Sequence, residues 1–194
     1  MTELADRNEY LSAGVHIGMK FKTKEMEPFI FKTRPGGLSV IDIEKTDERL
    51  KIAAKFIANY KNIIVACRKT NGFKPIDKFV EIVGGKAIKG RFLPGILTNP
   101  NSPEFYEPDL LIVTDPIADS QAIVEAKNRR IPIVGLCDTY NNMEFIDFCI
   151  PTNNKGKKSL GLIYFILARE ILKERKEIKK NSDFKYELKD FAEE

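Results

Sequence analysis

The chain passes from a strand into its longest apolar helix within residues 150–172, which read IPTNNKGKKSLGLIYFILAREIL. Pro151 has no amide hydrogen to donate to a strand ladder, so it predicts the end of an edge strand. Ser159 is a residue type that caps helices, and the apolar run that follows predicts a buried helix reaching about Lys180. A strand, a polar turn and a buried helix in this order are typical of α/β folds.

The turn between this strand and this helix is polar and cationic. It contains Asn153, Asn154, Lys155, Lys157 and Lys158. A helix N-terminus has free amide groups and the positive end of the helix dipole, so we expect these side chains to form a phosphate-binding site. A nucleotide P-loop is excluded, because its pattern requires glycine where Pro151 stands. A solvated loop whose asparagines only shape the turn remains an alternative.

Outward from this stretch, short apolar runs alternate with helical patterns. We expect one helix over 4–13, a second that begins with Thr46 as its N-cap, a third over 75–83 and a fourth that begins at 118–119. We expect strands at 29–33, 38–43, 63–67, 86–89, 110–113, 131–137 and 149–150. Strands that are apolar on both faces and alternate with helices predict a three-layer α/β/α fold with a mostly parallel, doubly wound, flavodoxin-like sheet. We predict one α/β domain over residues 1–180, with a basic N-terminal arm and a long C-terminal helix, and a charged, poorly ordered tail over 181–194.

Composition excludes several classes of protein. With 194 residues and 43% hydrophobic content, the chain can bury a core without staples. Its cysteines, Cys67, Cys137 and Cys149, lie in apolar runs and indicate buried thiols in a reducing compartment. Residues 1–14 are polar and acidic, unlike a signal peptide. The longest apolar run is far shorter than the roughly 20 residues of a membrane span.

Charge is segregated along the chain, although the formal net charge is only +4. Residues 15–40, 68–91 and 153–180 carry net charges of +3, +5 and +6, whereas 92–126 carries −6 and the tail 181–194 carries −3. Separate basic blocks favour a polyanionic partner. The acidic block suggests either basic protein neighbours or a separate acidic face.

The best enzymatic alternative is a magnesium site at the carboxyl ends of the strands. Asp115 and Asp138 follow neighbouring strands, at the edge where doubly wound sheets bind ligands. Such carboxylates could hold Mg²⁺ for phosphoryl transfer. However, aspartate is also expected in turns between strands and helices. The single histidine, His16, and three apolar-flanked cysteines supply no nucleophile and base pair, so we favour a binding protein over an enzyme.

Four motifs occur in an order and spacing that resemble one known family. They are SAGVHIG at 12–18, GRFLPGILTN at 90–99, LCDT at 136–139, and the 150–172 stretch. Together they resemble the small-subunit ribosomal protein S-two family, which in animals includes the laminin-receptor precursor. Bacterial members carry a long helical hairpin after the Thr-Asn loop, but here only residues 101–108 separate Pro100 from Asp109. This resembles the archaeal form. Tyr140 stands where the family usually has a short polar residue.

The resemblance implies a structural, non-catalytic protein of the cytoplasmic ribosome. The expected partners are small-subunit rRNA and neighbouring ribosomal proteins; no cofactor, metal, membrane or small-molecule substrate is expected. The aspartates then cap the fold and the basic loops contact rRNA. The family motifs give His16, Lys20, Arg91, Asn99, Asn153, Asn154 and Lys155 as rRNA-binding candidates. Charge alone adds Lys22, Lys24, Lys86, Lys157 and Lys158.

Overall fold

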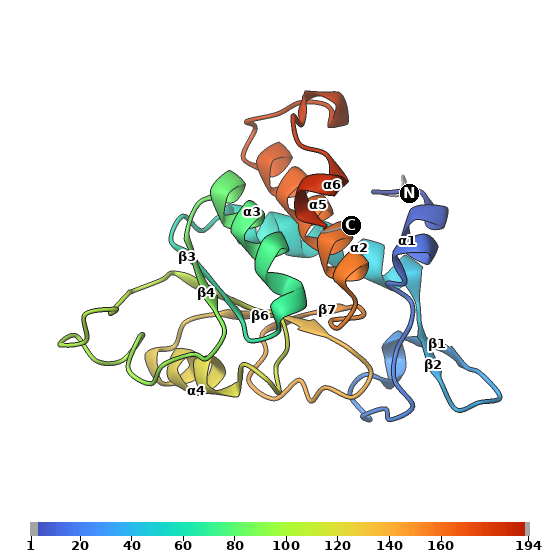
Figure 1. Ribbon diagram of the computed structural model, residues 1–194, viewed down its shortest axis with the longest axis horizontal. Coiled ribbons are helices and arrows are strands. Elements are labelled where there is room, and N and C mark those ends of the chain that lie inside the picture. The colour runs from blue at the N-terminus through green and yellow to red at the C-terminus, as the bar shows by residue number, and fades with distance from the viewer. Residues whose placement is uncertain (1–3, 193–194) are drawn as a thin grey trace.

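The computed structural model describes residues 4–192 and is centred on a five-stranded parallel sheet (Figure 1). From edge to edge, the strands are β4 (Lys86–Lys89), β3 (Ile63–Cys67), β5 (Leu110–Val113), β6 (Ile133–Cys137) and β7 (Phe148–Pro151). Numbered in chain order within this sheet, the arrangement is 2-1-3-4-5, the doubly wound order of flavodoxin-like folds. The predicted fold class is confirmed.

The two faces of the sheet are covered by different helices. Ile63 and Val65 of β3 pack against α2 (Ile43–Ala58), α3 (Phe73–Val83) and α5 (Lys157–Glu174). Ile64 and Ala66 point the other way and pack with α4 (Ser120–Arg129), because successive residues of a strand face opposite sides. Figure 1 shows α2, α3 and α5 above the sheet and α4 below it. The three layers follow from this alternation.

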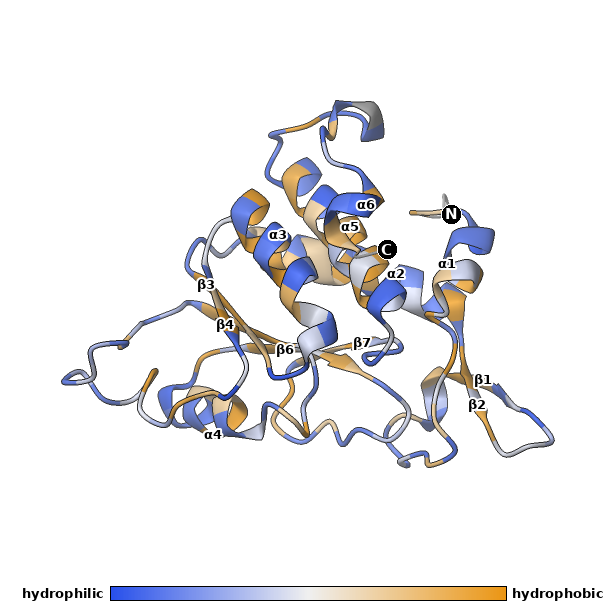
Figure 2. Cartoon of the chain, in the orientation of Figure 1, coloured by the Kyte–Doolittle hydropathy of each residue, from blue (hydrophilic) through white to orange (hydrophobic). Residues whose placement is uncertain are grey.

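Burial on both faces explains the apolar strands. Every residue of β3, β5 and β6 is buried. Figure 2 shows these strands as mostly hydrophobic and the loop tips as mostly hydrophilic. Helix α5 is buried at most positions from Ser159 to Leu172, because it lies on the sheet and is flanked by α2, α3 and the C-terminal segment. The apolar run in the sequence therefore reflects enclosure on several sides.

The N-terminal part of the chain forms a small addition to the main sheet. It comprises α1 (Arg7–Ala13), η1 (Glu27–Phe29) and the antiparallel strands β1 (Ile30–Thr33) and β2 (Ser39–Ile41). Residues 16–19 run along the free side of β2: Gly18 donates its amide hydrogen to the Ser39 carbonyl and Ser39 donates to the Met19 carbonyl. The hairpin stands away from the five-stranded sheet (Figure 1).

Two predicted helix caps are wrong. Helix α2 begins at Ile43 and is capped by the Asp42 carboxylate, which accepts the Glu44 amide at 3.0 Å. The Thr46 hydroxyl instead donates to the Pro151 carbonyl at 2.8 Å. Helix α5 begins at Lys157, so the predicted cap residue Ser159 lies within its first turn. The Thr46 bond holds α2 to the end of β7. The Ser159 hydroxyl donates to the Asn153 carbonyl in the turn that leads into α5.

The C-terminal segment is also packed, contrary to the expectation of an emerging helix and a poorly ordered tail. Helix α5 ends at Glu174, and the chain folds back through η3 (Asn181–Asp183) and α6 (Leu188–Phe191). Phe191 is fully buried and meets the Phe165 ring edge-on at 5.6 Å. A Cβ atom at Gly161 would lie 3.3 Å from the Phe191 carbonyl oxygen, so glycine permits this close approach. The tail is charged but carries aromatic residues that bury apolar area.

Candidate nucleic-acid interface

Basic side chains gather where the parallel strands end. Because the strands are parallel, the chain leaves each of them at the same edge of the sheet, here named the carboxyl edge. In the connections after β3, β4 and β7 and at the start of α5, the basic residues at this edge are Arg68, Lys69, Arg91, Lys155, Lys157 and Lys158. Residues up to 90 positions apart in sequence are thereby brought to one edge, as the predicted parallel sheet implies for the ends of its strands.

The turn before α5 is shaped by one asparagine. The Asn153 side-chain oxygen accepts the amides of Lys155 at 3.0 Å and Gly156 at 3.2 Å. Its side-chain nitrogen donates to the Gly14 carbonyl at 3.0 Å. The Ser159 hydroxyl donates to the Asn153 carbonyl at 2.7 Å. Asn153 thus fixes the backbone that presents the lysines.

Lys155 is held on an aromatic ring. Its ammonium lies 4.1 Å from the centre of the Tyr140 ring, a cation–π geometry. Its carbonyl accepts the Asn71 side-chain amide at 2.8 Å, which ties the loop after β7 to the one after β3. Lys157 and Lys158 are exposed beside it. The loop is a rigid platform with charges on its outer side.

A buried polar network lies beneath this platform and has Asp115 at its centre. One carboxylate oxygen is paired with Lys69 and accepts the Tyr140 hydroxyl at 2.8 Å, and the other accepts the Asn141 amide at 2.9 Å. Burial raises the pKa of Asp115, but the hydrogen bond and charge of Lys69, together with the hydrogen bonds from Tyr140 and Asn141, outweigh burial and lower the pKa from its ordinary value. The Asn154 amide donates to Asn141 at 2.9 Å and to the Leu136 carbonyl at 3.0 Å.

This network leaves no place for the magnesium ion of the enzymatic alternative. Both oxygens of Asp115 already accept hydrogen bonds from the chain's own residues. Asp119 accepts the Asp115 amide at 3.2 Å, and Asp138 accepts the Thr139 amide at 2.6 Å. Over residues 4–192, no group of three or more histidine, cysteine, aspartate or glutamate side chains could hold a metal ion. The aspartates are structural acceptors.

Asp119 and Asp138 differ from Asp115 because, within residues 4–192, neither forms an ion pair with a lysine or arginine. Burial is the main cause that raises the pKa of each to about 6. An acid whose pKa is higher in the folded than in the unfolded state binds its proton more tightly when folded. It therefore reduces stability as pH rises from the ordinary value near 3.8 to the folded value of about 6.

Replacing Asp138 with asparagine is therefore expected to stabilise the protein near neutral pH. The amide keeps an acceptor for the Thr139 amide but removes the buried charge, so the gain should be on the order of 1–2 kcal/mol at about pH 7.5. The gain should fade as pH falls toward 4. Urea denaturation at several pH values measures it, with Asp109→Asn, at an exposed carboxylate, as the control. A gain that does not depend on pH would contradict this account.

The basic N-terminal arm, residues 18–24, is fastened to the same edge. The Thr139 hydroxyl accepts the Met19 amide at 2.9 Å and donates to the Phe21 carbonyl at 3.1 Å. A Cβ atom at Gly18 would lie 2.5 Å from the Thr139 methyl group, so only glycine lets the two segments meet. The side chains of Lys20, Lys22 and Lys24 are exposed, and Lys22 is 2.8 Å from Glu27. The arm adds positive charge beside the lysine loop.

The remaining predicted residues are placed elsewhere. Asn154 is fully buried and belongs to the polar network. Lys86 begins β4 and lies at the opposite, amino edge, over the Tyr106 ring at 5.5 Å. Asn99 is exposed in the loop after β4, where its side chain accepts the Asn101 amide at 3.1 Å. Burial, then the charge of Arg34, lowers the pKa of His16, so this ring favours its neutral form.

Only three of the six acidic residues of the block 92–126 face solvent, namely Glu104, Glu107 and Asp109. Asp115, Asp119 and Glu125 are buried. Glu125 accepts the amides of Gly95 at 2.7 Å and Leu97 at 3.0 Å, so it fastens the loop after β4 to α4. In the sequence, Glu125 lies three residues after Ala122 and next to Ala126, which both face inward from the helix. This spacing is the signal that could have indicated a buried role for Glu125. Over residues 4–192, five acidic but only one basic residue are buried, so the surface is more basic than the formal charge suggests.

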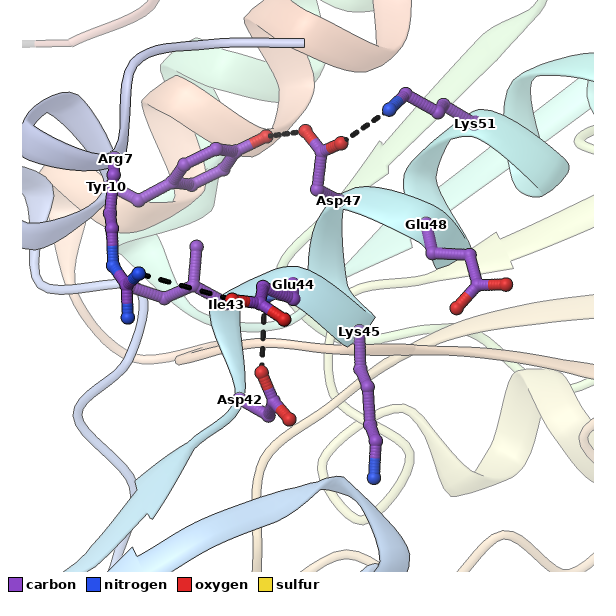
Figure 3. Close-up of a pocket in the computed structure, with 9 residues that line it drawn as sticks. All are labelled: Arg7, Tyr10, Asp42, Ile43, Glu44, Lys45, Asp47, Glu48 and Lys51. Atoms are coloured by element: carbon purple, nitrogen blue, oxygen red, sulfur yellow. Dashed lines mark hydrogen bonds and ion pairs between the residues drawn. The ribbon is translucent and has the colours of Figure 1, made fainter. Parts of the chain in front are cut away.

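A cleft of about 490 Å³ lies between α1 and the start of α2 (Figure 3). Asp47 accepts the Tyr10 hydroxyl at 2.9 Å and pairs with Lys51 at 2.7 Å. Arg7 lies 3.9 Å from Glu44. These groups pair with one another and fasten α1 to α2; no nucleophile and base face each other among the residues that line this cleft.

All three cysteines are free and buried, and no helix within 4–192 is long and apolar enough to span a membrane.

Residues 10–104 and 102–174 match the ribosomal protein S2 family. The chain is 48% identical over 190 residues to a protein of Picrophilus torridus, covering 97% of this chain and 95% of the relative. It is 52% identical over 184 residues to one of Pyrobaculum aerophilum (93% and 88%) and 47% identical over 190 residues to one of Thermoplasma acidophilum (97% and 96%). All three relatives, which are archaeal, carry the name small ribosomal subunit protein uS2. The chain therefore belongs to the ribosomal protein S2 family, in agreement with its four sequence motifs.

Proposed function

We propose that this chain is a structural constituent of the small ribosomal subunit that binds rRNA through its carboxyl edge and contacts neighbouring ribosomal proteins. Family membership makes it a structural ribosomal protein rather than an enzyme. It would function as part of the ribosome in the cytoplasm. The rRNA contacts we propose are Lys20, Lys22, Lys24, Arg91, Lys155, Lys157 and Lys158.

One observation carries this proposal: loops from distant parts of the chain bring their lysines and arginines to one edge and hold their backbones there. Contacts to phosphates come mainly from such side chains and position a protein without reading sequence. Asp115, Asp119 and Asp138 at the same edge are buried and do not cancel the outward charge. Among the proposed contacts, Lys22 is paired with an exposed carboxylate, Glu27. An edge of this kind suits the backbone of folded RNA better than an acidic or apolar partner.

Sedimentation of the native protein from a cell extract tests the proposal. In low salt, we expect it to migrate with the small subunit, and high salt should release it. If about six phosphates are neutralised on isolated rRNA, the logarithm of the binding constant should fall with the logarithm of salt concentration with a slope of about −4 to −5. A protein that stays at the top of the gradient in low salt, or a flat salt response, would overturn it.

A further inference from the structure

Phe21 projects from the basic arm into solvent. It is 79% exposed, the highest value among the large hydrophobic side chains within residues 4–192 that are exposed. Single exposed apolar residues are common and need no explanation by themselves. Phe21 differs in its surroundings, which combine a fixed backbone with three exposed lysines close to it in sequence.

The backbone that carries Phe21 is held from both sides. The Phe21 carbonyl accepts the Thr139 hydroxyl at 3.1 Å. The Thr23 amide donates to the Thr139 carbonyl at 2.9 Å, and the Thr23 hydroxyl donates to the Asn141 carbonyl at 2.8 Å. Thr139 and Asn141 are themselves buried. The ring therefore extends from a fixed point, so little conformational entropy is lost when something covers it.

Positive charge surrounds this fixed ring. Lys20 and Lys22 are its immediate neighbours in sequence, Lys24 follows, and all three are exposed. Lys22 also pairs with the exposed Glu27 at 2.8 Å, a contact that a phosphate would have to displace. A bare phosphate would need only the lysines, and an apolar protein surface would need only the ring. A single-stranded nucleic acid supplies both partners, because its phosphates attract lysines and its unpaired bases stack on aromatic rings.

We propose that Phe21 is a stacking platform for an unpaired RNA base, with Lys20, Lys22 and Lys24 holding the adjacent phosphates. This inference rests on the proposed function and adds the class of RNA feature that the arm takes: an unpaired nucleotide rather than the backbone of a duplex. Bases inside a duplex are stacked on one another and cannot reach the ring. Stacking is largely independent of sequence, because every base has a π face.

Two substitutions separate stacking from other contacts. Phe21→Leu keeps an apolar side chain but removes the ring, whereas Phe21→Trp keeps a ring and adds the only tryptophan of the chain. On isolated small-subunit rRNA, Phe21→Leu should bind roughly 5- to 150-fold more weakly, with an unchanged salt slope. Phe21→Trp should bind as tightly as the wild type. Its fluorescence should be quenched by a single-stranded adenine oligonucleotide but not by an RNA duplex of equal length.

The controls distinguish charge from stacking. Lys20→Ala should make the salt slope shallower by about one unit, a change that the Phe21 variants should not show. Val124→Ala, at a side chain 49% exposed on α4, should leave binding unchanged. Thermal melting of each variant checks the fold, which should be unaffected because the Phe21 ring lies outside the core.

Each other outcome has a definite meaning. Wild-type affinity of Phe21→Leu for rRNA would overturn the stacking inference while leaving the proposed function intact. A defect seen only when other ribosomal proteins are present would also overturn it, since a protein would then cover the ring. No binding of the wild type to rRNA at any salt concentration would instead reject the proposed function itself.

Discussion

Replacing Asp115 with alanine is expected to lower the free energy of unfolding by about 3–5 kcal/mol. The carboxylate is 2% exposed and is the common partner of Lys69, Tyr140 and Asn141. Its removal leaves a half-buried ammonium, a hydroxyl and a buried amide without their acceptor, and each loses a bond that water cannot fully replace. Because the Lys69 side chain retains 27% exposure and can turn toward solvent, we expect a loss near the lower limit.

Thermal and urea denaturation measure this loss, and the melting temperature should fall by roughly 10 °C. The pKa of Asp115 is lower in the folded state than its ordinary value of 3.8, so its stabilisation is present above that pH. The difference between wild type and variant should therefore shrink as pH falls below about 4. Asp109→Ala, at an exposed carboxylate, is the control. A loss for Asp115→Ala no larger than that of the control would show that Asp115 does not organise the network.

Replacing Lys155, Lys157 and Lys158 together with alanine is expected to weaken rRNA binding on the order of 100-fold at about 0.1 M salt. Each lost phosphate contact should make the salt slope shallower by about 0.7–0.9, so three contacts remove about 2–3 units. The difference from the wild type should therefore vanish toward 1 M salt. Filter binding at several salt concentrations measures both the affinity and the slope.

The matched control removes the same charge from another part of the surface. Lys55 lies in the last turn of α2, Lys61 in the loop between α2 and β3, and Lys179 beyond the end of α5. All three are exposed and lie toward the amino edge of the sheet. Their combined replacement should leave the salt slope nearly unchanged, although the net charge falls equally. If both triple variants lose affinity to the same extent, the interaction depends on total charge and not on the carboxyl edge. Unchanged rRNA binding by the Lys155/Lys157/Lys158 variant would show that the loop before α5 is only a solvated turn.

Local patterns predicted most of the secondary structure. The strands Ile63–Cys67, Lys86–Lys89 and Leu110–Val113 begin and end at the predicted residues. Errors occurred where tertiary contacts override local preference: Thr46 and Ser159 resemble caps but lie inside helices. The C-terminal segment was mispredicted because its many charges outweigh, in the sequence pattern, two aromatic side chains, Phe184 and Phe191, that are buried against Phe165 of α5.

The sequence by itself determined the alternation of strands and helices, the parallel sheet, the segregated basic blocks and the family, because each depends on near neighbours or on ordered motifs. Only the tertiary structure decided which charged groups face solvent. Asp115 meets Asn141 from 26 positions away, and Asn154 approaches Lys69 from 85. Distant pairings of this kind made Asp115 and Glu125 internal acceptors. Lys157 and Lys158 stay exposed. A buried polar group needs a partner, and the partner is chosen by the packing of the whole chain rather than by the residues beside it.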